Sequence, residues 1–267
     1  MKPILRWAGS KRHSVGVLAE YWERAGATRY VEPFAGSAAL FYRVGARRAL
    51  LGDLNAELIH TYRTIKREPR GVGRVLRRWP GDAATYYRLR ALKPSSLTPT
   101  QRAARFLFLN RWCFNGIYRT NKNGEFNVPF GGQRVGPPVS DSELVETASI
   151  LQRARLVCGD FEDTLAAVAP SDFVFMDPPY SVRGKRVFND YSARGFGEVD
   201  LRRLRLQLER LDALGARFVV SYADSIEGKW LARGFEVATI SVHRNVGGFR
   251  SRRRRAVEIL ISNVGTV

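Results

Sequence analysis

The sequence Phe173-Val174-Phe175-Met176-Asp177-Pro178-Pro179-Tyr180 joins an apolar run to an acidic, proline-rich turn. A short apolar run that ends in turn residues is typical of a buried strand in a parallel sheet. Asp177 would then follow the carboxyl end of a central strand, where open α/β sheets build their binding sites. The stretch therefore predicts an α/β fold with a polar site at that edge.

Short apolar runs and helix-like segments alternate on both sides of this stretch. The other strands of the parallel sheet are expected at 30–31, 49–51, 156–158 and 217–221. Helices are expected at 38–44, 56–66, 161–168 and 201–214. This alternation predicts a parallel sheet with crossover helices. The apolar runs 235–242 and 256–261, joined by the loop 247–255, predict a terminal antiparallel hairpin that closes the sheet.

The middle of the chain breaks the alternation. Residues 56–141 are rich in Arg, aromatic and turn residues. We interpret this segment as an inserted second domain, which leaves 1–55 and 142–267 as the α/β domain.

The net charge of +19 comes from 44 Lys and Arg residues, of which only seven are Lys. The planar fork of Arg suits phosphate groups and guanine edges, so a polyanionic partner is the leading interpretation. An Arg-rich surface without any partner is the alternative that composition leaves open.

Composition also argues against several classes of protein. Two cysteines, Cys113 and Cys158, are too few for a disulfide framework or a four-ligand zinc site, and we expect both to be buried thiols. No segment approaches the ~18 apolar residues of a membrane span. We therefore expect a cytoplasmic protein without a metal centre.

The turn that begins at Asp177 suits chemistry on an exocyclic amino group. The lone pair of such a nitrogen is delocalised into the base ring. Asp177 and the carbonyl of Pro178 can each accept one amino hydrogen and so localise it, while Pro179 stiffens the turn and Tyr180 offers a stacking face. The target base would have to be flipped out of a duplex. A plain Pro-Pro turn with a packed Tyr is the structural alternative.

Two further motifs are typical of a nucleotide-like cofactor. The segment 31–38 contains Phe34-Ala35-Gly36 and resembles a strand that turns into a helix, so that backbone amides face a ligand. It lacks the glycine pattern of nicotinamide dinucleotide sites. Asp53, at the end of the next strand, suits ribose hydroxyls, or alternatively caps the helix near Ala56. The stretch Arg6-Trp7-Ala8-Gly9-Ser10-Lys11 is a weak signal alone.

Taken together, these motifs resemble the Dam-type DNA adenine N6-methyltransferases, the alpha group of the D12 class. The order of the motifs agrees along the whole chain. The most specific blocks are 106–119, which reads FLFLNRWCFNGIYR, and 124–131, which reads GEFNVPFG. The fold implied is a Rossmann-like S-adenosylmethionine-dependent methyltransferase sheet with an inserted target-recognition domain of helices and a hairpin.

The resemblance implies S-adenosylmethionine as the cofactor. Its methionine end would lie near Trp7, Ala8, Gly9 and Lys11, in a pocket lined by Phe34, Ala35 and Gly36. Asp53 would bind the ribose, Asp160 and Phe161 would flank the adenine ring, and Asp177 would lie between cofactor and target amine.

The resemblance also implies double-stranded DNA as the partner, bound by a monomer associated with the nucleoid. Arg119 would contact a guanine, Pro129 a thymine methyl group, and Phe114 and Asn115 the space left by the flipped base. Arg6, Arg111, Asn121, Arg252 and Arg253 would bind DNA outside the bases, mainly at phosphates. The target would be GATC or a related short site. DNA cytosine N4 methylation and a catalytically inactive DNA-binding relative are the alternatives.

Overall fold

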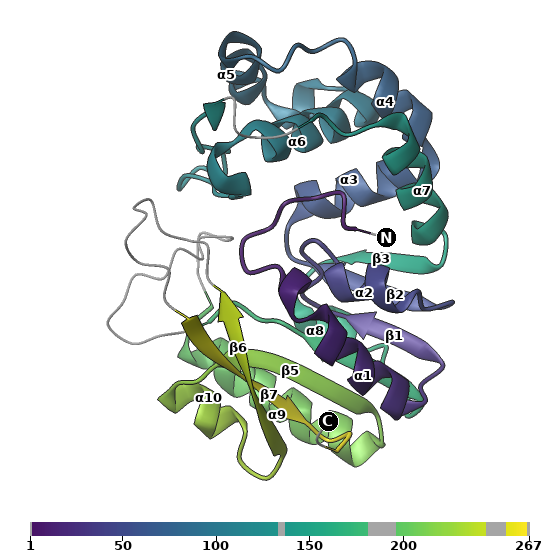
Figure 1. Ribbon diagram of the computed structural model, residues 1–267, viewed down its shortest axis with the longest axis vertical. Coiled ribbons are helices and arrows are strands. Elements are labelled where there is room, and N and C mark those ends of the chain that lie inside the picture. The colour runs from purple at the N-terminus through teal and green to yellow at the C-terminus, as the bar shows by residue number, and fades with distance from the viewer. Residues whose placement is uncertain (1, 133–136, 181–195, 244–254, 266–267) are drawn as a thin grey trace.

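The computed structural model describes residues 2–132, 137–180, 196–243 and 255–265. In this part the chain forms a seven-stranded sheet with the order β3-β2-β1-β4-β5-β7-β6 (Figure 1). The strands are β1 Arg29–Glu32, β2 Ala49–Asp53, β3 Ala154–Cys158, β4 Asp172–Met176, β5 Arg217–Ala223, β6 Glu236–His243 and β7 Arg255–Ser262. The first five are parallel, whereas β7 pairs antiparallel with both β5 and β6. The predicted α/β sheet with a terminal antiparallel hairpin is confirmed.

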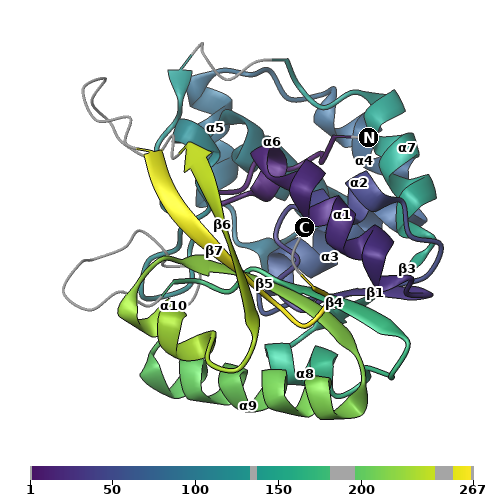
Figure 2. The same cartoon turned by 60° about the horizontal axis from the view of Figure 1, so that its bottom comes forward.

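Helices cover both faces of the sheet, as Figure 2 shows: α1, α2 and α3 lie on one side and α8, α9 and α10 on the other. The helices are α1 Val15–Ala25, α2 Ala39–Val44, α3 Ala56–Arg67, α4 Pro69–Leu76, α5 Ala83–Ala91, α6 Pro99–Trp112, α7 Asp141–Leu151, α8 Phe161–Leu165, α9 Glu198–Leu214 and α10 Ile226–Leu231. Helices α1, α7 and α10 were not predicted from the sequence.

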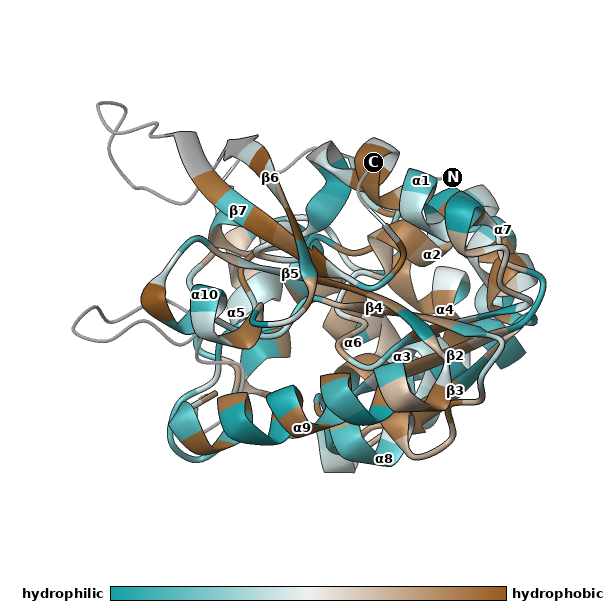
Figure 3. Ribbon diagram, turned by 90° about the horizontal axis from the view of Figure 1, so that it is seen from below, coloured by the Kyte–Doolittle hydropathy of each residue, from teal (hydrophilic) through white to brown (hydrophobic). Residues whose placement is uncertain are grey.

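Strand β4 is buried on both faces, because its successive side chains point to opposite sides of the sheet. Phe173 and Phe175 pack in one core cluster, and Val174 and Met176 in the other. All of them are at most 2 % exposed. Figure 3 shows hydrophobic β4 and β5 between helices that carry both hydrophilic and hydrophobic residues. A fully buried side chain of this size contributes about 1.5–3 kcal/mol relative to an exposed one. The apolar run thus fixes β4 at the centre of the sheet.

The segment between β2 and β3 forms a helical layer, α3 to α7, beside the sheet (Figure 1). Leu58 of α3 and Phe106 of α6 belong to the same core cluster as Tyr30 of β1. A smaller cluster, which includes Tyr86, Phe108 and Val128, lies under the far side of this layer. Division of the chain at 56 and 141 stays a prediction, since α3 packs against β2 and β3 as well as α6.

The structure corrects one expectation about the cysteines. Cys113 is buried, as predicted, but Cys158 is exposed. Cys158 ends β3, which is the edge strand of the sheet, so one flank of this strand has no neighbouring strand to cover it. The apolar neighbours of Cys158 in the sequence therefore did not imply burial.

Candidate active site

Three acidic residues lie at one edge of the sheet because the strands that carry them run parallel. Glu32 is the last residue of β1, Asp53 is the last residue of β2, and Asp177 directly follows β4. Glu32 is only 3 % exposed and accepts a hydrogen bond of 3.0 Å from the Tyr30 hydroxyl. The predicted polar edge at the carboxyl ends of the strands is thus strongly acidic.

Lys11 is the cation at the centre of this edge. Its Nζ lies 2.7 Å from Oδ1 of Asp177 and 3.5 Å from Oε2 of Glu258. The same ammonium donates hydrogen bonds of 3.0 Å to the Tyr180 hydroxyl and 3.2 Å to the Gly9 carbonyl. Lys11 is 7 % exposed, so it forms a buried ionic cluster with partners from both ends of the chain.

Burial changes the pKa values of this cluster. Burial alone would lower the pKa of Lys11, but Asp177, Tyr180 and Glu258 together raise it above its ordinary value. Burial raises the pKa of Asp177 to about 6, and the ion pair with Lys11 limits this rise. Burial also raises the pKa of Glu32 well above its usual range. A carboxyl group whose pKa lies close to neutral pH is typical of functional sites.

Glu258 belongs to this cluster and was missed in the sequence. It is 5 % exposed, lies opposite Ala223 in the β5–β7 pair, and accepts a hydrogen bond of 3.2 Å from Ser221. The available signal was a single acidic residue within the apolar run 256–261. A lone acid in a buried strand needs a partner, and Lys11 supplies it.

The amino-terminal stretch lies against the turn after β1. Gly36 adopts φ +46°, and a Cβ there would meet the Trp7 ring at 2.7 Å. Ser10 and Ser37 share a hydrogen bond of 2.9 Å between their hydroxyls. Gly9 has φ +77°, Ala8 is half-buried, and Ala35 is 3 % exposed with its amide bonded to the Gly52 carbonyl. The amino-terminal stretch and the turn within segment 31–38 therefore meet in one place.

Asp53 organises the same turn. Its Oδ2 accepts a hydrogen bond of 2.9 Å from the Gly36 amide, and its Oδ1 accepts one of 2.8 Å from the Asn55 amide. Burial raises the pKa of Asp53 to about 6 despite these two bonds. The alternative that Asp53 caps the helix is wrong, because the cap of α3 is Asn55, which accepts from the Leu58 amide.

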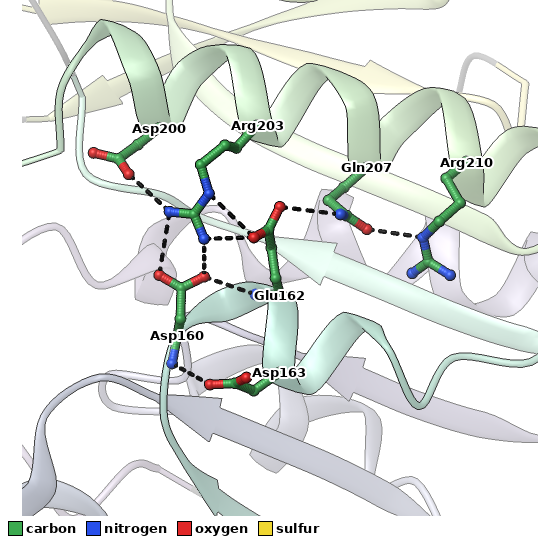
Figure 4. A network of polar contacts seen from close by, with 7 residues as sticks. All are labelled: Asp160, Glu162, Asp163, Asp200, Arg203, Gln207 and Arg210. Atoms are coloured by element: carbon green, nitrogen blue, oxygen red, sulfur yellow. Dashed lines mark hydrogen bonds and ion pairs between the residues drawn. The ribbon is translucent and has the colours of Figure 1, made fainter.

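Phe34 and Phe161 stack with their ring centroids 5.4 Å apart, beside a polar network on α8 and α9. In Figure 4, Arg203 reaches from α9 to three carboxylates. Its guanidinium lies 2.6 Å from both Asp160 and Glu162 and 3.0 Å from Asp200, and 4.7 Å from the centre of the Phe161 ring. Arg203 was not identified in the sequence. It fixes both predicted adenine-flanking residues from a separate helix.

The recognition block begins at the end of α6, where Asn110 ties it to the amino-terminal stretch. Asn110 accepts a hydrogen bond of 2.9 Å from the Arg6 amide and donates one of 2.7 Å to the Arg6 carbonyl. Asn110 is 3 % exposed. This reciprocal pair links the block to the stretch that contains Trp7 and Lys11.

Within the block, the chain folds back on itself through two isolated antiparallel bridges, Cys113 with Phe130 and Thr120 with Phe126. The predicted hairpin therefore has two separate bridges in place of a continuous ladder. Phe114 is 44 % exposed, and its amide donates a hydrogen bond to the carbonyl of Pro129. Pro129 is also an exposed residue. Asn115 is also exposed and adopts the left-handed conformation, with φ 54°.

The polar residues predicted within the block have local partners. The Nε of Arg119 donates a hydrogen bond of 2.8 Å to the Asn127 side chain. Asn121 accepts hydrogen bonds of 3.0 Å from the amides of Asn123 and Glu125. Arg119 is therefore oriented by Asn127, whereas Asn121 shapes the turn of the block.

Three arginines gather where the block meets the amino terminus. Burial and the charge of Arg6 lower the pKa of both Arg12 and Arg111. The Nε of Arg111 is buried and has no hydrogen-bond partner in the described part of the chain. Arg12 was not identified in the sequence. Arg252 and Arg253 lie outside the described residues.

The structure describes the chain from residue 2 to residue 265 with three gaps. No helix there is long and apolar enough to cross a membrane. Groups of three or more His, Cys, Asp or Glu residues arranged to hold a metal ion are also absent from the described residues.

The comparison with protein families gives one match, which spans residues 7–246: the D12 class N6 adenine-specific DNA methyltransferases. A Type II methyltransferase of Lactococcus lactis subsp. cremoris is 30% identical over 99% of this chain and 96% of its own. A retron DNA adenine methylase of Escherichia coli is 32% identical, over 97% of this chain and 90% of its own. A DNA adenine methylase of Vibrio cholerae is 29% identical, over 97% and 95%.

The family match runs from Trp7, in the amino-terminal stretch, past Asp177 and the whole of β6 to residue 246. The sheet, the acidic edge and the recognition block all lie largely within it. The chain therefore belongs to the D12 class N6 adenine-specific DNA methyltransferases.

Proposed function

We propose that this methyltransferase uses S-adenosylmethionine to methylate the N6 amino group of an adenine that is flipped out of duplex DNA. One observation carries the proposal. The carboxylate of Asp177 forms a 2.7 Å ion pair with Lys11 and lies at the same strand edge as Asp53 and Glu32. Asp177 can therefore accept a hydrogen bond from the target amine at the same acidic edge that would bind a cationic cofactor.

The acidic edge fits S-adenosylmethionine by charge. Asp53, Asp177 and Glu258 surround the site with Lys11 as the cation that pairs with two of them. The raised pKa values of Asp53 and Asp177 would fall beside a positive charge. When bound, S-adenosylmethionine supplies an electrophilic methyl group on a positively charged sulfur. Such a cation is favoured where carboxylates outnumber ammonium groups.

Different residues near this edge would bind different parts of the cofactor. Asp53 would bind the ribose hydroxyls, and Phe34 and Phe161 would pack against the adenine ring. Oδ2 of Asp160 makes one long hydrogen bond of 3.4 Å to Arg203, so it can still accept from the adenine amino group. The methionine end would lie along Trp7, Ala8, Gly9, Lys11, Ala35 and Gly36.

Asp177 and the carbonyl of Pro178 would each accept one hydrogen of the target amine. The nitrogen lone pair then points at the methyl group instead of being delocalised into the ring. After methyl transfer the nitrogen must lose one proton, and the Asp177 carboxylate accepts it. Pro179 stiffens the turn, and the Tyr180 hydroxyl, hydrogen-bonded to Lys11, holds its ring at the site of the flipped base.

The recognition block would read the DNA. Phe114 and Asn115 are exposed at its base, directly after α6, and suit the space that the flipped base leaves. Arg119 would contact a guanine and Pro129 a thymine methyl group in a GATC or related site. The mutually repelling Arg6, Arg12 and Arg111 would be neutralised by a phosphate. Asn121, Arg252 and Arg253 would add further contacts to the DNA backbone.

Expression in a host that lacks DNA methylation tests this proposal. Long-read sequencing of the host DNA should show modified adenines within one short sequence, and mass spectrometry of digested nucleosides should show N6-methyladenine. The same host with an empty vector is the control. N4-methylcytosine as the product, or no modification, would overturn the proposal.

A further inference from the structure

A basic groove lies at the end of the sheet opposite the candidate active site. It has a volume of about 910 Å³ and is lined by the amino ends of β1, β2 and β3 and by the last turns of α3. Seven of its lining residues are Arg or Lys, and the remaining four, Ala49, Gln152, Ala154 and Leu156, are uncharged. The groove is therefore an anion-attracting surface that the methyl-transfer chemistry does not use.

Most of this charge is not compensated. Arg29 pairs with Asp172, and Arg67 with Glu68. In the ranges that the structure describes, the remaining five cations form no ion pair. These are Arg48, Arg63, Lys66, Arg153 and Arg155.

Neutral backbone carbonyls hold three of the five in place. Arg63 donates to the Leu156 carbonyl at 2.9 Å, and Lys66 to the Ala154 carbonyl at 2.9 Å. Arg153 donates to the Gly45 carbonyl at 3.2 Å. These bonds orient the side chains but leave their charge for an external anion. A fixed array of guanidinium groups suits phosphates, which bind Arg in a bidentate way.

The groove is separate from the methylation site. Strand β2 has Asp53 at its carboxyl end and begins at Ala49, which lines the groove. Five residues of extended chain span roughly 15 Å. Parallel strands have all their amino ends together and all their carboxyl ends together. The groove therefore lies at the amino ends of the strands, and the acidic edge lies at their carboxyl ends.

We propose that this groove is a second binding site for the phosphate backbone of duplex DNA. It would hold a segment other than the one at the active site. The enzyme acts on DNA, so a second stretch of the same molecule is the polyanion at the highest local concentration. Holding two segments would keep the enzyme on a long DNA between successive methylations.

A double substitution in the groove tests the site. Arg48 and Arg155 are exposed, and neither side chain makes a hydrogen bond within the described residues, so Arg48→Glu/Arg155→Glu should fold normally. Lys229→Glu/Arg233→Glu is the matched control: it changes the net charge equally, and its positions lie in or just after α10. Thermal melting compares the fold of both variants. Arg48→Gln/Arg155→Gln serves as a milder second variant.

The measurement is capture of a labelled second duplex by enzyme already bound to an immobilised short duplex. Wild type and the control variant should capture it, and the groove variant should lose at least roughly tenfold in capture, with a salt slope lower by about 2. Single-turnover methylation of a short duplex should stay within about twofold in every variant. Equal losses in both double variants, or no capture by wild type, would overturn the second site without affecting the proposed methylation.

Discussion

The ammonium of Lys11 lies 2.7 Å from a carboxylate oxygen of Asp177, although 165 other residues separate them in the chain. Glu258 and Tyr180 contact the same ammonium, which links the amino-terminal stretch, the turn after β4 and strand β7. The charge of Lys11 therefore offsets the cost of burying Asp177 as an anion. Breaking a buried pair by removing one partner is usually more costly than the pair is worth, because the other charge stays buried.

Lys11→Met should lower the free energy of unfolding by about 3–5 kcal/mol. It should also raise the pKa of Asp177 further above about 6, since the opposing charge of Lys11 is lost. The acidic limb of the single-turnover rate should then move to higher pH, because Asp177 must be ionised to act. Lys2→Met, at an exposed position, is the control, and Lys11→Arg should keep the wild-type limb. An unchanged limb in Lys11→Met would contradict the coupling.

The affinity for S-adenosylmethionine should rise with pH through about 6. Burial raises the pKa values of Asp53 and Asp177 to about 6, so both are largely protonated below that pH and ionised above it. A cationic cofactor favours the ionised forms, so binding near pH 6 should release protons, and the affinity should increase roughly tenfold from pH 5 to 7. Calorimetry in buffers of different ionisation enthalpy measures the release. S-adenosylhomocysteine, which lacks the sulfonium charge, should release fewer protons, and an equal release for both would contradict the charge argument.

Arg203→Ala should weaken cofactor binding, because it frees Asp160 and Phe161 to move. We expect a three- to tenfold loss of affinity and roughly 1–2 kcal/mol less stability, since a network of partly exposed pairs is worth little more than that. The neighbouring Arg202 offers a matched control: its side chain is 69% exposed, and within the described part of the chain its one ion pair is with Glu198. Arg202→Ala should change both quantities little. Equal effects of the two substitutions on cofactor titrations would rule out a positioning role for Arg203.

Phe114→Ala should impair base flipping without affecting the fold. Phe114 is 44 % exposed, so its truncation should change stability by at most about 0.5 kcal/mol. A fluorescent adenine analogue at the target position should show a smaller increase in fluorescence on binding, because the vacated space is no longer filled. Leu206→Ala, at a 64% exposed position on α9, is the control. If Phe114→Ala gave the same fluorescence increase as wild type, other residues would have to fill the space that the flipped base leaves.

The sheet and much of the site could be predicted because their signals are local. Phe173 to Met176 is apolar on both faces, so β4 had to be central, and the residue that follows a parallel strand must lie at its carboxyl edge. That rule alone brings Asp53 and Asp177 together. Helix α10, by contrast, was missed: its six residues include Gly228, and glycine disfavours the interior of a helix.

The remaining features depend on contacts across the fold. Glu258 joins the site only through the register of β7 on β5, where it lies opposite Ala223. Arg203 reaches Asp160 from a helix 43 residues away in the sequence. The exposure of Cys158 follows from the position of β3 at the edge of the sheet. No pattern within a short window of sequence carries such information.

Single-turnover methyl transfer by Asp177→Ala tests the role of Asp177 most directly. Wild type and variant are mixed with labelled S-adenosylmethionine and duplex DNA that contains the identified site, and N6-methyladenine is quantified by mass spectrometry. Asp212→Ala is the control, because Asp212 lies near the carboxyl end of α9 and bonds to Asn263 instead of to Lys11. We predict a rate at least about 10²-fold lower for Asp177→Ala, with cofactor affinity within about tenfold of wild type. Methylation by Asp177→Ala at the wild-type rate would contradict the assignment of Asp177 as the acceptor for the target amine.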